Sequence, residues 1–138
     1  MKDTTLIKKK RRDLYALYRK WLEEGRFSSM RDAGNYLATI PAPCFYTSPE
    51  AASLLVGRLL DGRSLSDLNS SKRRLVRRLH EEYKKYLSDH PGTKLSRVRI
   101  MNELVDRPAP EFYMTPDAIR RALRIEIQDT KRKMGWGE

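Results

Sequence analysis

Two stretches of the sequence decide the fold: "IPAPCFYTSPEA" over residues 40–51 and "RPAPEFYMTPDA" over residues 107–118. Each begins with a Pro-Ala-Pro triplet, and proline disfavours helix at the residue before it. Each ends with Ser or Thr, then Pro, then an acidic residue, which is the signature of a helix start. The sequence therefore predicts an extended PAPxFY connector that leads directly into a helix, and it predicts this arrangement twice.

The similarity between the two stretches extends upstream of them. At the same offset of 67 residues the matching pairs are Ser29 with Ser96, Asn35 with Asn102, and Leu37 with Leu104. Further upstream, the tyrosine-rich segments "DLYALYRKWLEEG" and "LHEEYKKYLSDHPG" align after a one-residue slip. Self-similarity at a fixed offset indicates that the chain contains two copies of one structural unit.

Apolar residues at helical spacing predict three helices in each copy. We expect them at about 5–24, 29–40 and 48–60 in the first copy, and at about 70–87, 96–107 and 115–133 in the second. For the fourth helix, the sequence predicts an N-cap at Ser70 or Ser71. The predicted fold is all-α, with two tandem, related three-helix units packed as one compact domain. The first unit spans residues 1–62, a linker spans 63–70, and the second unit spans 71–138. Each unit is helix-turn-helix-like, except that an eight-residue connector replaces the usual tight turn.

The Phe–Tyr pair of each connector has two interpretations. The first is a structural plug between the second and third helices of its copy, with one or two neighbouring residues paired as a short strand. The second is a ligand-stacking role for Tyr46 and Tyr113.

The composition bounds the classes of partner. The 138 residues include 29 Lys and Arg against 18 Asp and Glu, a net charge of +11, and both halves of the chain are net positive. Such a balance favours polyanionic partners. A single cysteine excludes an intramolecular disulfide, and neither a secretory signal nor a long apolar run is present. We therefore expect a soluble, cytoplasmic protein that does not bind membranes.

No pattern in the sequence indicates catalysis. His80, His90 and Cys44 lack the spacing of metal ligands, and the glycines form no phosphate-binding loop. Adjacent glutamates such as Glu81 and Glu82 diverge around a helix, so they do not form a pair for acid–base chemistry. The sequence predicts a protein that is not an enzyme and that uses no metal or cofactor.

Three basic clusters are the candidate binding residues. We expect the four arginines 73, 74, 77 and 78 to share one exposed flank of a helix because they are four residues apart in pairs. Glu81 and Glu82, one turn later, provide an alternative role for part of this charge, as local ion pairs. The candidate nucleic-acid-binding residues are Lys8, Lys9, Lys10, Arg11, Arg12, Lys72, Arg73, Arg74, Arg77, Arg78, Arg120, Arg121 and Arg124.

The sequence leads to two hypotheses for function. The first is a non-enzymatic nucleic-acid-binding protein, DNA favoured over RNA, in which basic helix faces contact phosphates. The alternative is a structural or adaptor protein, such as a virion component or an accessory of a mobile element, that binds an acidic protein partner. Both hypotheses leave open a further protein partner or a homo-oligomer.

Overall fold

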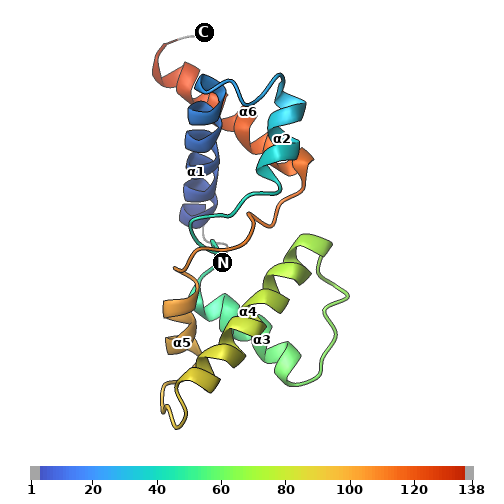
Figure 1. The fold of residues 1–138 in the computed structure, drawn as a ribbon, viewed down its shortest axis with the longest axis vertical. Helices are drawn as coiled ribbons and strands as arrows, with labels where there is room; N and C mark the ends of the chain where they lie inside the picture. The colour runs from blue at the N-terminus through green and yellow to red at the C-terminus, as the bar shows by residue number, and fades with distance from the viewer. Residues whose placement is uncertain (1–3, 136–138) are drawn as a thin grey trace. The chain divides into compact units, whose positions relative to one another are not determined.

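A computed structural model of the protein describes residues 4–135, and within this range the regular structure is entirely helical (Figure 1). The all-α prediction is confirmed. The six helices are α1 (Thr4–Glu23), α2 (Met30–Leu37), α3 (Pro49–Leu60), α4 (Ser70–Asp89), α5 (Arg97–Leu104) and α6 (Pro116–Lys133).

Side-chain caps begin five of these helices. Asn69 caps α4, and its Oδ1 accepts a hydrogen bond of 2.8 Å from the backbone N–H of Lys72. The sequence-based choice of Ser70 or Ser71 for this cap is wrong by one or two residues, because asparagine and serine cap helices almost equally well. Ser48, Ser96 and Thr115 cap their helices where the sequence predicts them. For α2 the sequence predicts Ser28 or Ser29, and the cap is Ser29.

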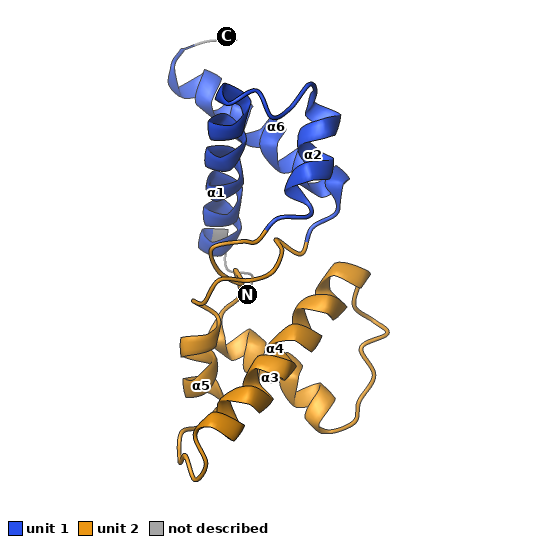
Figure 2. Ribbon diagram, in the orientation of Figure 1, with its two compact units in different colours: residues 1–40, 114–138 blue, residues 41–113 orange. Residues whose placement is uncertain are grey.

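The helices group into two compact units, and the grouping differs from the division expected from the repeat (Figure 2). Unit 1 contains α1, α2 and α6, and unit 2 contains α3, α4 and α5. The third helix of each copy therefore packs with the first two helices of the other copy. The segment 63–70, expected to separate the units, joins α3 to α4 inside unit 2. The helices of the packed pairs α2/α6 and α3/α5 are not consecutive in the chain, because other helices lie between them. Neither pair is therefore connected by a turn, as the two helices of a helix-turn-helix unit are.

In unit 1, α6 packs against both α1 and α2. Leu14 of α1, Leu37 of α2 and Leu123 of α6 are fully buried. Unit 1 also contains an aromatic cluster, in which the ring of Tyr36 meets the rings of Trp21 and Phe27 edge-on. Burial of these apolar faces supplies most of the stability of such short helices.

In unit 2, the two connectors lie side by side. The backbones of Ala42 and Ala109 exchange two hydrogen bonds of 2.9 Å, which form a single antiparallel bridge. The ring of Phe45 stacks on Tyr113, and that of Phe112 on Tyr46, with centroids 6.2 and 5.9 Å apart. Each aromatic pair therefore stacks on the pair of the other copy. This pairing gives a physical reason for the exchange of third helices, because paired extended connectors cannot fold back onto their own copies.

One arginine crosses a glycine in each packed helix pair. In unit 1, Arg120 of α6 lies over Gly34 of α2, so that a Cβ added to the glycine would be 2.7 Å from the arginine Cγ. In unit 2, Arg97 of α5 lies over Gly57 of α3. Its Nε donates hydrogen bonds of 3.0 Å to both the carbonyl and the hydroxyl of Ser53. The same contact is thus built twice, with the arginine and the glycine on opposite helices.

Candidate nucleic-acid interface

The outer face of α6 carries two free arginines. Arg121 and Arg124 are exposed, and within residues 4–135 neither side chain makes an ion pair or hydrogen bond. Ile125, 44% exposed, and Gln128 continue the same face. The spacing i, i+3, i+4 and i+7 places all four side chains on one side of the helix. This α6 face is cationic and open.

Arg120, the third predicted residue of α6, points the other way. Its guanidinium forms an ion pair with Asp117 and donates a hydrogen bond of 3.2 Å to the carbonyl of Arg31. The hydrogen bond from Arg120, followed by the positive charges of Arg120, Arg121 and Arg124, lowers the pKa of the Asp117 carboxyl. Only 17% of the Arg120 side chain is exposed, so it packs α6 against α2.

The α4 cluster divides into two flanks, so the prediction of one shared flank is wrong. Arg74 makes two hydrogen bonds to Glu111, at 3.1 and 2.9 Å, which raise the pKa of its guanidinium. Arg78 pairs with Glu82 at 3.1 Å. Successive residues lie about 100° apart around a helix, which is enough to separate this pair of arginines from their neighbours.

The other flank of α4 keeps more of its charge available. Arg73 donates a hydrogen bond to the backbone carbonyl of Leu68 and forms no ion pair. The side chains of Arg77 and Lys72 make neither an ion pair nor a hydrogen bond within the described part of the chain. Arg73 and Arg77 line a hollow of about 280 Å³ together with Ser64, Leu65 and Ser66.

The α1 cluster also divides. Lys9 forms an ion pair of 3.1 Å with Asp13, and Arg11 reaches Glu126 of α6 at 3.5 Å. Lys10 is half-buried. Lys8 and Arg12 are exposed, and neither is engaged by a carboxylate of residues 4–135.

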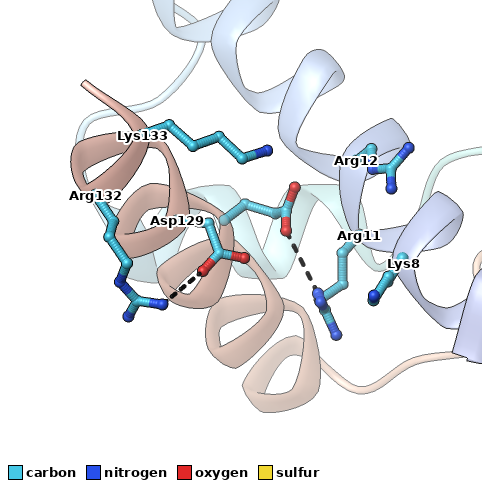
Figure 3. A pocket seen from close by; sticks show the side chains of 7 residues that line it. Lys8, Arg11, Arg12, Asp129, Arg132 and Lys133 are labelled. Carbon is cyan, nitrogen blue, oxygen red and sulfur yellow. Dashed lines mark hydrogen bonds and ion pairs between the residues drawn. The ribbon is translucent and has the colours of Figure 1, made fainter. Parts of the chain in front are cut away.

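A second hollow, of about 330 Å³, lies between α1 and the end of α6 (Figure 3). Glu126 holds Arg11, and Asp129 lies 3.7 Å from Arg132, so each carboxylate of the lining has a cationic partner. The lining has five cations and two carboxylates: Lys8, Arg11, Arg12, Glu126, Asp129, Arg132 and Lys133.

The sequence-based prediction therefore missed the residues that complete both hollows. Glu126 lies two residues and Asp129 five residues after Arg124, the last candidate residue, and neither was among the candidates. Ser64 and Ser66 belong to a segment that was interpreted as a linker. The two serines of "RSLS" at residues 63–66 are possible hydrogen-bond donors to an anion, but the sequence does not show that they lie next to α4.

Three further observations concern other classes of site. Cys44 is half-buried. Among residues 4–135, no three or more His, Cys, Asp and Glu side chains form a group that could hold a metal ion. In that same range, no helix has the length and apolar content needed to cross a membrane. No family model, curated protein or solved structure matches this chain.

Proposed function

We propose that the protein binds nucleic acid, DNA in preference to RNA, through the α6 face, and that it catalyses no reaction. One observation carries the proposal: Arg121 and Arg124 lie on one exposed helix face, and within residues 4–135 neither side chain makes an ion pair or a hydrogen bond. The net charge of +11 adds a long-range attraction to polyanions.

The shape of an exposed helix is the argument for DNA. The major groove of B-form DNA admits an α-helix, whereas the major groove of A-form RNA is too deep and narrow for side chains to read. Arginine binds phosphates and guanine edges, glutamine binds adenine, and an apolar side chain contacts the thymine methyl. Arg121, Arg124, Ile125 and Gln128 supply each of these chemistries on one face.

A double substitution tests this proposal. Arg121→Gln with Arg124→Gln should weaken binding to duplex DNA about tenfold or more, since each contact is a charge-assisted hydrogen bond. If both arginines contact phosphates, the slope of log affinity against log salt should fall by about 1.8. The measurement is a fluorescence-anisotropy titration at several salt concentrations, on duplex DNA and on duplex RNA.

The control removes the same charge elsewhere. Lys84 and Lys85 are exposed on α4, and no carboxylate within residues 4–135 pairs with them. Lys84→Gln with Lys85→Gln should change the affinity by less than the α6 pair does. Equal losses in both variants would mean that only the overall charge matters, and the α6 face would lose its assigned role.

The alternative function, an adaptor for a protein partner, has one observation in its favour. Leu54 of α3, at the position equivalent to Arg121, is 69% exposed. An exposed leucine on an outer helix face suits a protein partner better than a phosphate chain. If the protein shows no saturable binding to DNA or RNA at low salt, the adaptor becomes the better proposal.

A further inference from the structure

We infer that each unit contains a phosphate-binding hollow at the same place in its fold. This place lies beside the first helix of one copy, α1 or α4, and next to the end of the third helix of the other copy, α6 or α3, or the residues just after that end. The inference deepens the proposed function and rests on it, because it names which cations contact phosphates besides the α6 face. The two hollows are the 280 Å³ hollow of unit 2 and the 330 Å³ hollow of unit 1.

The hollow of unit 2 offers only donors to an anion. Arg77 has no partner in the described chain, and Arg73 is bonded only to the Leu68 carbonyl, which leaves most of its N–H groups available. The Ser64 hydroxyl donates a hydrogen bond of 2.9 Å to the Ser66 hydroxyl, which leaves the Ser66 proton available for a bound oxygen. The lining contains no carboxylate.

The hollow of unit 1 is equivalent to it by two offsets. The buried Leu14 of α1 corresponds to the buried Leu79 of α4, which is an offset of 65 residues. The alignment of the tyrosine-rich segments in the sequence has a larger offset. At that offset, Lys8 and Arg12 correspond to Arg73 and Arg77. At the offset of 67 that relates α6 to α3, the other walls match as Arg132 with Leu65 and Lys133 with Ser66.

The cations are therefore kept at equivalent positions of the two first helices, although the neighbouring residues have diverged. A structural role does not explain them, because Lys8, Arg12 and Arg77 have no partner within residues 4–135. Two copies that both place a cation pair four residues apart beside a hollow point to a shared anionic ligand.

The size and chemistry of the hollows favour phosphate. Their volumes lie at the lower end of the range for small-molecule pockets, about 300–1,000 Å³, so they suit one or two phosphate groups better than a whole nucleotide. A guanidinium binds phosphate oxygens through two parallel N–H donors. In the unit 1 hollow, Glu126 and Asp129 already engage Arg11 and Arg132. Three cations of that lining, Lys8, Arg12 and Lys133, remain for an anion, so replacing Lys8 and Arg12 still leaves one of them in place.

The test uses inorganic pyrophosphate as the probe of the full-length protein, measured by isothermal titration calorimetry. Arg73→Gln with Arg77→Gln should weaken pyrophosphate binding about tenfold or more, given the strength of charge-assisted hydrogen bonds. Lys8→Gln with Arg12→Gln should have a smaller effect. The charge-matched control, Lys84→Gln with Lys85→Gln, should change the affinity less than twofold. Equal effects of the control, or no saturable pyrophosphate binding by the wild type, would overturn the inference.

A second variant guards against a folding defect. Arg73→Gln removes the bond to Leu68 and would loosen the loop, whereas the Arg77 side chain makes no hydrogen bond or ion pair in the described chain. Arg77→Gln alone should therefore keep the wild-type thermal melting curve and still weaken pyrophosphate binding. Wild-type affinity in this single variant would remove Arg77 from the site and refute the assignment.

A parallel titration with duplex DNA identifies the source of the phosphate. If Arg73→Gln with Arg77→Gln weakens both ligands, the hollow takes phosphates of the nucleic-acid backbone. If it weakens pyrophosphate alone, the ligand is a free phosphate compound. The two proposals fail separately: pyrophosphate binding in a protein that does not bind DNA refutes the proposed function only, and α6-dependent DNA binding with an inert hollow refutes this inference only.

Discussion

The two units use the same packing contact in opposite directions. In unit 1 the arginine belongs to the third helix of its copy, as Arg120 of α6, and the glycine to the second, as Gly34 of α2. In unit 2 the arginine belongs to the second helix, as Arg97 of α5, and the glycine to the third, as Gly57 of α3. The reversal decides which helix must carry a glycine on the side that meets its partner.

This difference connects packing to the candidate interface. Gly57 of α3 corresponds, at the offset of 67, to Arg124 of α6. In unit 2, α3 has a glycine at this position, where Arg97 packs, whereas in unit 1 the glycine lies on α2. The next position shows the same contrast, since Arg58 of α3 is held by Asp67 while its counterpart Ile125 is exposed. Reversing the contact therefore leaves α6 free to present cations.

The largest expected effect comes from separating the units in fragments. A fragment of residues 41–113 contains all of unit 2, so we expect helical circular dichroism and a cooperative thermal transition. A fragment of residues 1–62 contains one sequence copy but lacks α6, against which both α1 and α2 pack. Most helical stability in proteins comes from the packing of an apolar helix face, so this fragment should lose most of its helix content.

The control for the fragments is a mixture. Adding a peptide of residues 114–138 to the 1–62 fragment should restore helical signal, because α6 completes unit 1. A cooperative transition in the 1–62 fragment alone would show that each copy folds by itself, and the exchange of third helices would not hold in solution.

Substituting the two glycines tests the reversed contact directly. A Cβ at Gly34 would lie 2.7 Å from Cγ of Arg120 and 3.0 Å from the backbone carbonyl of Pro116, which cannot move aside easily. Gly34→Ala should therefore lower the free energy of unfolding by about 1–3 kcal/mol, as overpacking usually does. Chemical denaturation of the full chain measures this loss.

Gly57→Ala is the matched comparison. The Cβ would meet only the guanidinium of Arg97, with its nearest nitrogen at 2.7 Å, and the end of a flexible side chain can shift. Alanine also favours helix over glycine by about 1 kcal/mol. We expect a stability within about 1 kcal/mol of the wild type. A larger loss at Gly57 than at Gly34 would reverse our interpretation of which contact is rigid.

Local chemistry made much of the fold predictable from the sequence. Ser48 and Thr115, each followed by proline and an acidic residue, predict the starts of α3 and α6 at the residues where the structure has them. The exchange of third helices was not predictable, because the apolar face of α3 is compatible with the first two helices of either copy. The sequence also does not indicate that the Phe–Tyr pair of each connector stacks on the pair of the other copy.

The candidate site was predictable only in part, for a similar reason. The sequence identifies Arg121 and Arg124 as unexplained cations, and the structure leaves them exposed. It could not show that Arg120, their neighbour, turns inward, because the hydrogen-bond acceptor, the carbonyl of Arg31, comes from a distant part of the chain. The partner of Arg74, Glu111, lies in a connector for which the sequence indicated no polar role.

The smallest effect concerns a pair of equivalent tyrosines, Tyr46 and Tyr113, which share a left-handed backbone with φ of 54° and 56°. Tyr113 is the more buried, with 8% of its surface exposed. Burial, and then the negative charge of Glu111, raise the pKa of the Tyr113 phenol to about 12. In the unfolded chain a tyrosine loses its proton near pH 10.

The stability of the protein should therefore depend on Tyr113 at high pH. Between pH 10 and 12 the unfolded state releases this proton before the folded state does, so the phenol contributes full stability below pH 10 and loses it as the pH rises. At pH 11 the loss is about 1 kcal/mol. Tyr113→Phe lacks the proton, so the difference in free energy of unfolding between wild type and variant should be constant up to pH 10. It should then shift toward the variant by that amount at pH 11. Parallel curves across this range would show that the phenol is as accessible in the folded protein as in the unfolded chain, and the deeper burial that distinguishes Tyr113 from Tyr46 would not hold in solution.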